Sequence, residues 1–329
     1  MRPKVPGLLP AGRAGCRLAC LAAAVAALGP GARGAGEPEL TRELRAHVTM
    51  LAETIGPRAL GHGDSLRRAA DYVAGELARD GWTVRRLPYE VRGVVCENIE
   101  VERRGARQPD EIIVIGAHYD SIVSTPGADD NASGVAALLA LAKRFRAEGR
   151  EPDRTLRFVA FPNEEPMYFQ TRFMGSRVYA RACRERGDRI VGMLSLESIG
   201  YYSSRRGTQH YPSIWIALFR PSRGNFLAFV GNKSSAPLLD QATQAFGESG
   251  KLPLQRAALP DGVQGVGWSD HWSFWQEGYP AIMATDTATF RNPHYHQPTD
   301  KPDTLDYASF TAAVEGLEAV VAALVTQTP

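Results

Sequence analysis

IIVIGAHYD, residues 112–120, is the stretch that decides the fold. An unbroken run of apolar and small residues predicts a strand that is buried on both faces, as in parallel sheets. His118 and Asp120 follow this run at once, and a Gly/Asp-rich loop at residues 127–134 leads into an apolar helix expected at 133–146. A buried strand, a polar loop and an apolar helix in this order indicate an α/β fold.

The same alternation continues on both sides of this unit. Helices are expected at residues 41–54, 65–80, 174–184, 237–248 and 307–325. Strands are expected at residues 82–87, 94–101, 155–161, 190–196 and 281–284, with a further apolar segment at 214–219 continuing the pattern. Helices that alternate with short apolar strands predict a mostly parallel, mixed sheet covered by helices on both faces.

Composition limits the possible functions. The chain has 329 residues, of which 44% are hydrophobic, so it can bury a full core. Its formal net charge is only +2, and no long run of Lys and Arg interrupts the sequence. This balance argues against nucleic acid or an acidic membrane surface as a principal partner.

The first 36 residues differ from the rest. Four basic residues between Arg2 and Arg17 precede an apolar, alanine-rich run at 18–28, and small residues follow as far as Gly36. A basic head, a short apolar segment and a small-residue exit predict a secretory signal over residues 1–36. The mature chain is then exported (periplasmic or secreted) and free of the membrane. The alternative is a disordered Ala/Gly-rich tail.

Four cysteines are present, and two of them lie inside the expected signal. Cys96 and Cys183 would remain in the mature chain. An exported protein can pair two cysteines, but spacing alone does not show that these two approach each other. They are isolated and far apart, so they do not form a zinc knuckle. A buried free thiol is the default expectation for each.

Polar residues with metal-binding chemistry follow several expected strands. His118 and Asp120 follow the first strand, Glu164-Glu165 and Glu197 follow two others, and a histidine-containing loop follows the last. Ligands of parallel sheets gather beyond the carboxyl ends of the strands, so these side chains are expected at one edge. Separately, each has an ordinary explanation: a helix cap at Asp130, a surface pair, or a loop histidine.

Together, two histidines and several carboxylates suit Zn²⁺, which accepts nitrogen and oxygen ligands. Five ligands hold two ions if one carboxylate bridges them. Two such ions polarise a carbonyl group and acidify a shared water, whose proton a neighbouring carboxylate then takes as general base. The pair Glu164-Glu165 offers one residue for each duty.

Four motifs resemble a known family. They are His118-Tyr119-Asp120, residues 127–134, Asn163-Glu164-Glu165 and Tyr295-His296-Gln297-Pro298-Thr299-Asp300. They are similar to the metal motifs of the co-catalytic two-zinc aminopeptidases of clan MH, the bacterial leucyl aminopeptidase type, whose wider relatives are glutamate carboxypeptidase and the glutaminyl cyclases. The resemblance covers roughly residue 65 to the end. It implies a zinc exopeptidase (phosphorylase/hydrolase-like) fold, with residues 37–329 as one catalytic domain.

The resemblance also implies residue roles. By it, His118, Asp130 and Glu197 hold one zinc, Glu165 and His296 hold the other, Asp130 bridges, Glu164 is the general base and Asp120 orients His118. Position 197 departs from the pattern, since many members of the family carry Asp there, and the longer arm puts the metal spacing in question. His294 is the rival of His296 as a ligand. Asp270, in Trp268-Ser269-Asp270-His271, is expected near the site without binding zinc.

The function implied is a metallo-aminopeptidase with two Zn²⁺ per chain, which hydrolyses the first peptide bond of peptides with a free N-terminus. Three alternatives stay open: a glutaminyl cyclase with one zinc, a carboxypeptidase, and a non-catalytic receptor-like homologue. A carboxypeptidase needs a basic pocket, for which Arg172, Arg177 and Arg291 are candidates. Residues 167–169 either line an apolar substrate pocket or pack on the core. The oligomeric state is left open.

Overall fold

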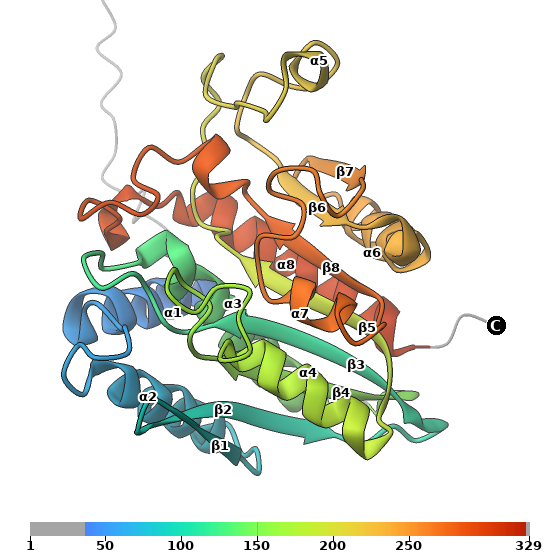
Figure 1. The fold of residues 1–329 in the computed structure, drawn as a ribbon. Coiled ribbons are helices and arrows are strands. Elements are labelled where there is room, and N and C mark those ends of the chain that lie inside the picture. The colour runs from blue at the N-terminus through green and yellow to red at the C-terminus, as the bar shows by residue number, and fades with distance from the viewer. Residues whose placement is uncertain (1–36, 150, 327–329) are drawn as a thin grey trace, which may run out of the picture. The chain divides into compact units, whose positions relative to one another are not determined.

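The described part of the chain is built on one eight-stranded sheet (Figure 1). The computed structural model describes residues 37–149 and 151–326, so the expected signal, Cys16 and Cys20 lie outside the described residues. The strands are β1 (Arg85–Val91), β2 (Val94–Arg103), β3 (Gln108–His118), β4 (Arg154–Phe161), β5 (Arg189–Glu197), β6 (Leu227–Gly231), β7 (Leu254–Ala258) and β8 (Ala281–Thr285). Their order across the sheet is β1-β2-β4-β3-β5-β8-β6-β7.

The middle of the sheet is parallel and its margins are mixed. β4, β3, β5 and β8 run side by side in the same direction. β2 runs antiparallel to β4, and β6 runs antiparallel to β8. The predicted mostly parallel, mixed sheet is therefore confirmed. Because the four central strands are parallel, their carboxyl ends all reach one edge of the sheet.

Helices cover both faces of the sheet. They are α1 (Glu39–Thr49), α2 (Ser65–Arg79), α3 (Gly134–Ala147), α4 (Gly175–Arg186), α5 (Ile214–Ala217), α6 (Ala236–Ser249), α7 (His271–Trp275) and α8 (Tyr307–Val325). Alternate residues of β3 show that there is a hydrophobic core on each face of the sheet. Ile113 and Ile115 enter the large core beneath α1, α2, α3, α6 and α8, whereas Ile112 and Val114 enter a smaller core beneath α4 and α7. Side chains of a strand alternate between faces, so a strand covered on both faces is apolar throughout.

One expectation of the sequence was wrong. The apolar segment at 214–219 adds no strand to the sheet; its first four residues form α5, none of which is buried. Figure 1 shows α5 lying apart from the sheet, beyond β6 and β7. β6 and β7 were not expected at all. They are only five residues long, and β7 is half-buried throughout, so its hydrophobic signal is weak.

α8 is a core helix. Its length and composition would also allow it to cross a membrane, with a mean hydropathy of 1.6 over its most apolar window. In the described chain its apolar residues join the large core, and it packs against α6, α1 and α3. Burial in the core therefore accounts for its hydrophobicity.

Both cysteines of the described region are free and buried. Cys96 lies in the large core and Cys183 in the smaller one. This confirms a buried thiol as the state of each.

Candidate metal centre

The side chains expected to bind metal gather where the central strands end. His118 is the last residue of β3 and Glu197 the last of β5, while Glu164 and Glu165 follow β4 within four residues. Asp130 lies in the turn Ala128–Ser133, which directly precedes α3 and in which the backbone of Asp130 itself is not helical. His296 lies in the long loop between β8 and α8. Five separate segments thus deliver donors to one edge of the sheet, as the strand pattern predicted.

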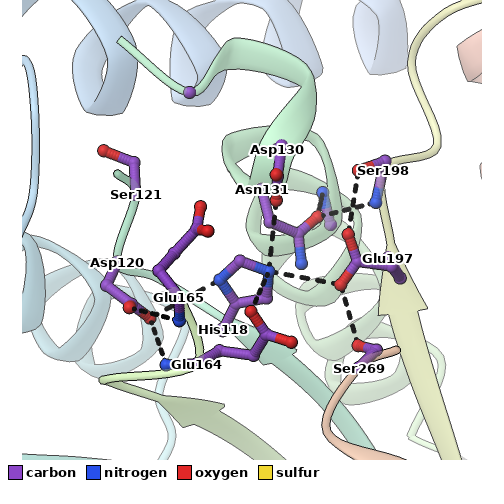
Figure 2. Close-up of polar contacts among 12 residues, drawn as sticks. His118, Asp120, Ser121, Asp130, Asn131, Glu164, Glu165, Glu197, Ser198 and Ser269 are labelled. Atoms are coloured by element: carbon purple, nitrogen blue, oxygen red, sulfur yellow. Dashed lines mark hydrogen bonds and ion pairs between the residues drawn. The ribbon is translucent and has the colours of Figure 1, made fainter. Parts of the chain in front are cut away.

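His118 lies at the middle of one half of the cluster (Figure 2). Its Nε2 is 3.2 Å from Oε2 of Glu197 and 3.3 Å from Oδ1 of Asp130. The nearest oxygen of Glu164 is 3.9 Å from the same nitrogen. The imidazole itself is fully buried. We call the set of His118, Glu197 and this oxygen of Asp130 the enclosed position.

The second half is built around His296. Its Nε2 lies 3.0 Å from Oδ2 of Asp130 and 3.3 Å from Oε2 of Glu165. We call the set of His296, Glu165 and this oxygen of Asp130 the outer position. Asp130 thus directs one oxygen to each imidazole, which is the arrangement that a bridging carboxylate requires.

His296, rather than its rival His294, is the histidine that joins the cluster. The Nδ1 atom of His294 is 2.9 Å from the hydroxyl of Thr299 on the exposed side of the loop. The His296 backbone has a φ of 59°, and its ring stacks on Tyr295 with the ring centroids 3.9 Å apart. This unusual backbone turns the imidazole of His296 inward.

Asp120 touches His118 and also supports the Glu164-Glu165 pair. Its Oδ1 is 3.5 Å from Nδ1 of His118, in the direction expected for a residue that orients the ring. Its stronger contacts are with the backbone: the N–H groups of Glu164 and Glu165 donate to its two oxygens, each at 3.1 Å. Figure 2 shows both bonds. Asp120 therefore places both glutamates relative to His118.

Two further side chains, to which the sequence assigned no role of their own, hold the Asp130 turn. Asp300 accepts the N–H groups of Asp129 and Asp130, at 2.9 and 3.2 Å. Asn131 accepts the N–H groups of Gly134 and Ser198 and donates to the carbonyl of Leu196, which ties the start of α3 to the end of β5. The resemblance had marked Asp300 only as a neighbour of His296, and its backbone partners explain its presence.

Glu197 has its long arm fixed by two hydroxyls. Ser198 donates to Oε1 and Ser269 donates to Oε2, both at 2.8 Å (Figure 2). Serine hydroxyls on both oxygens limit the extra freedom of a glutamate at this position. Glu197 is therefore held beside His118, although its side chain is longer than the aspartate that the resemblance leads us to expect.

The carboxyl groups of the cluster are crowded in a buried place. Burial raises the pKa of Glu164 well above 4.5, and burial together with Asp130 raises the pKa of Glu165 to about 8. Burial acts in the same direction on Asp130, but His118 and His296 outweigh it and hold the pKa of Asp130 below its ordinary value. Buried like charges repel, so the site favours positive charge between these groups.

For the two imidazoles, burial acts to lower the pKa, and the neighbouring carboxylates raise it. Burial acts to lower the pKa of His118, yet Glu164 and Glu197 raise it well above 6.5. Burial likewise acts to lower the pKa of His296, while Asp130 and Glu165 raise it to about 10. At both rings the neighbouring carboxylates thus favour a positive charge, which a bound metal ion would also supply.

Asp270 and His271 lie beside the cluster and differ in role. Burial raises the pKa of Asp270 to about 7, against the influence of His118. The Nε2 atom of His271 lies 2.7 Å from the carbonyl oxygen of Val266, and burial lowers the pKa of this imidazole to about 4. His271 is thus a neutral, buried group bonded to the backbone, and Asp270 is a buried acid near the enclosed position.

An apolar cavity of about 350 Å³ adjoins the enclosed position. Glu197 and Tyr295 form part of its wall, and aromatic or apolar side chains form most of the rest. The main apolar contributors are Trp215, Phe219, Phe226, Trp268, Met283 and Phe290. Residues 167–169 do not line it: Met167 is exposed and Tyr168 packs against Phe173. The alternative that these residues pack locally fits Tyr168.

The donor set fits zinc. His118, Asp130 and Glu165 place one donor atom each within 4.8 Å of one another. Nε2 of His296 and Oε1 of Glu165 are buried and form no hydrogen bond with any described residue, although carboxylate oxygens lie close to Nε2. Close donors that do not bond to each other are explained by a shared cation. Nitrogen and oxygen donors in this number suit Zn²⁺.

The fold and this donor set define a peptidase of the zinc exopeptidase class. The model of peptidase family M28 matches residues 98–321. YfbL, an uncharacterised protein of Escherichia coli, is 38% identical over 283 residues, which cover 84% of this chain and 85% of YfbL. The chain belongs to peptidase family M28. It spans only about half the length of several other curated relatives.

Solved structures agree on the fold. BSAP, a zinc aminopeptidase from Bacillus subtilis, has a TM-score of 0.71 at 15% identity, over 88% of this chain and 96% of that one. A glutaminyl cyclase from Bacteroides thetaiotaomicron has a TM-score of 0.63 at 17% identity, over 85% of this chain and 97% of that one. The family resemblance, the fold class and the class of enzyme read from the sequence are thereby confirmed.

Proposed function

We propose that this chain is a two-zinc aminopeptidase, which removes the first residue from peptides with a free amino end. Its centre would use His118, Asp130 and Glu197 for one ion, and Asp130, Glu165 and His296 for the other. We also propose that the chain acts after export, as a soluble enzyme.

The observation that carries the proposal is the position of Asp130 between two imidazoles. Its Oδ1 is 3.3 Å from His118 and its Oδ2 is 3.0 Å from His296, and each imidazole has a further carboxylate of its own within 3.3 Å. A single-metal site needs only one such set. Two matching sets that share one carboxylate support two ions.

Bound zinc would supply Lewis acidity, polarising the scissile carbonyl and making a bound water acidic. The protein's share is to hold and move a proton. Glu164 has an oxygen 3.9 Å from Nε2 of His118. In the described chain His296 pairs only with Asp130 and Glu165, so no similar extra acid lies beside it. Burial raises the pKa of Glu164, which suits a carboxyl that takes a proton and returns it to the leaving amine. Asp120 keeps Glu164 in place through its backbone N–H.

The surplus of acids supports a positively charged substrate end. Glu164 and Asp270 are buried acids beside the cluster that the proposed ligand set leaves free. Burial raises the pKa of both acids, which shows that no nearby positive charge fully offsets it, and the ammonium group of a free amino terminus would supply one and so confine cleavage to the first peptide bond. The adjoining apolar cavity has the size and lining to take an aromatic or long aliphatic first side chain.

The carboxypeptidase alternative loses support from the positions of its candidate arginines. Arg177 forms an ion pair with Glu277, and Arg291 is buried, donating to Gln209 and lying over Phe226. Arg172 is exposed and lies over Phe173. Two of the three are thus engaged by neighbours, and the third faces solvent, so none is offered to a substrate carboxylate.

The test is Asp130→Ala, measured by zinc content, far-UV circular dichroism and hydrolysis of aminoacyl, N-blocked and N-terminal glutaminyl substrates. We expect close to two zinc ions in the parent and loss of both from the variant, with the fold kept. Asp240→Ala, at an exposed aspartate of α6 that pairs with Arg256, is the control and should keep both ions. One zinc in the parent with turnover of glutaminyl substrates only would replace this proposal with a cyclase. No zinc would favour a receptor-like protein.

A further inference from the structure

Arg58 is a fully buried arginine that reaches the loop directly after His118 and the loop that leads to Asp130. It lies outside residues 98–321, the segment matched by the family model. Its Nε donates to the carbonyl of Tyr119, at 2.9 Å, directly after His118. Its Nη1 and Nη2 donate to the carbonyls of Pro126 and Gly127, at 2.6 and 2.9 Å, just ahead of the Asp130 turn. One guanidinium therefore spans both loops.

The backbone of Arg58 adds to the same link. Its N–H donates to the hydroxyl of Ser121, and its carbonyl accepts the N–H of Ser121. Nη1 also donates to the carbonyls of Leu51 and Gly56, which attach the guanidinium to the turn after α1. The anchored arginine thus fixes the metal-bearing loops relative to a rigid helix.

The charge of Arg58 has no direct acidic partner among the described residues. Its hydrogen-bond acceptors are backbone carbonyls, and no carboxylate of the described chain forms an ion pair with it. A buried charge without such a partner is costly, and the hydrogen bonds to backbone carbonyls are what offset that cost here. Burial lowers the pKa of Arg58 to about 10, while Asp120, Asp300, Glu165 and Asp130 raise it, and the guanidinium stays charged at neutral pH.

Gly127 shows how closely the loop is fitted to this arginine. Its backbone has a φ of 61°, which favours glycine. A Cβ at this position would lie 2.4 Å from the carbonyl oxygen of Asp130 and 3.0 Å from Nη2 of Arg58. The loop therefore comes close enough to Arg58 for its carbonyl to accept, and only a residue without a side chain allows this.

We propose that Arg58 is a positioning residue of the zinc centre: its guanidinium sets the separation of His118 and Asp130 before metal binds, and its charge offsets the crowded carboxylates from behind. Lysine would supply the charge but not the fork, since only a planar guanidinium offers donors to several carbonyls at fixed angles. The inference rests on the proposed zinc centre.

The experiment compares Arg58→Met and Arg58→Lys with the parent by competitive zinc titration against a chelator, alongside urea unfolding of the chelator-treated proteins. Loss of a group that orients metal ligands typically weakens metal binding by about 10–100-fold. We expect a loss of this size at both positions for Arg58→Met and a smaller one for Arg58→Lys. The control is Arg157→Met. Arg157 is another buried arginine, in β4, which pairs with Glu102 and Asp188. Loss of the Arg157 side chain should lower the free energy of unfolding without weakening zinc binding.

Three outcomes would overturn the inference. They are parental zinc affinity in Arg58→Met, an equal loss in Arg157→Met, or a loss confined to one position. If the Arg58 variants do not fold, hydrogen exchange of the chelator-treated parent decides. The amides of Ser121, Ala128 and Ala132 should stay protected without zinc, and free exchange there beside a protected β3 would show that Arg58 does not hold the loops. Absence of zinc from the parent would count against the proposed function instead.

Discussion

The enclosed and outer positions use the same kinds of side chain on different supports. His118 and Glu197 are the last residues of β3 and β5, with side chains 0% and 7% exposed. Glu165 is equally buried, but His296 belongs to a loop and its side chain is 29% exposed. Hydroxyls of Ser198 and Ser269 fix Glu197, whereas Oε1 of Glu165 has no hydrogen bond within the described chain.

The enclosed position is therefore held more firmly by its surroundings than the outer position. Donors at strand ends are held by the sheet, so they lose little conformational entropy when metal binds. His296 lies on a loop and is partly exposed to solvent, so fewer neighbours hold it. We therefore expect the enclosed position to bind zinc more tightly and the outer position to exchange it faster.

The largest effect should separate the adjacent acids Glu164 and Glu165, which face different positions. Glu164→Gln keeps the shape of the side chain but cannot accept a proton, so turnover should fall about 10²–10⁴-fold with two zinc ions retained. Glu165→Gln should instead empty the outer position, with activity partly restored by added zinc. Zinc content and kcat are measured on both. Metal loss in the Glu164 variant alone would reverse the two roles, and near-normal turnover there would remove the proposed mechanism.

A smaller effect should rank the two positions themselves. His296→Ala is expected to lose one zinc and keep the other, because the enclosed set is intact. Glu197→Ala should weaken the enclosed ion by about 10-fold or more, since even groups that only orient ligands are worth 10–100-fold. Chelator titration of the parent should remove one ion well before the second. His294→Ala is the control and should keep both ions. Simultaneous loss of both ions from the parent would erase the distinction.

The pH dependence of the chelator-treated protein should report the outer position. The folded pKa of His296 is about 10, above the ordinary 6.5, so its stabilising contribution is complete below pH 6.5 and is lost as the pH rises through 10. Glu165, at about 8, has the same sign, because the folded chain again holds the proton longer. The urea midpoint should fall from about pH 4.5, where the contribution of Glu165 begins to be lost, to about pH 10, and His296→Gln should flatten the part of that fall above pH 6.5. A slope unchanged by His296→Gln would contradict the assignment.

The sequence predicted the strand-borne half of the site better than its supports. Unbroken apolar runs indicate buried strands. A polar residue at the end of such a run is easy to recognise, as His118 and Glu197 are. The carboxyl ends of parallel strands meet, so these residues were expected to come together, and they do. His296 was chosen over His294 by resemblance, and its inward orientation depends on a left-handed backbone that no local pattern reveals.

The supports were missed for a physical reason. Arg58 and Asp300 act through backbone carbonyls and N–H groups that lie far away in the sequence, and backbone groups are the same in every residue. The sequence left the position of the substrate pocket open for a related reason. Its walls come from β6, β7, β8 and the segment around α5, which converge only in the fold. Residues 167–169 were instead considered because they follow Glu165 directly.

The smallest expected effect concerns the cavity that adjoins the enclosed position. Phe219 and Leu218 are neighbours after α5 and both are largely exposed, but only Phe219 lines the cavity. An aromatic contact of this kind contributes about 1 kcal/mol, or roughly fivefold in kcat/KM. Phe219→Ala should therefore lower kcat/KM about fivefold for peptides that begin with leucine or phenylalanine, and leave peptides that begin with glycine unaffected. Leu218→Ala removes a similar exposed side chain outside the cavity and should change neither. An equal loss for glycine peptides would place Phe219 in a general structural role, whereas a loss in Leu218→Ala would show that the segment, and not the cavity wall, determines the effect.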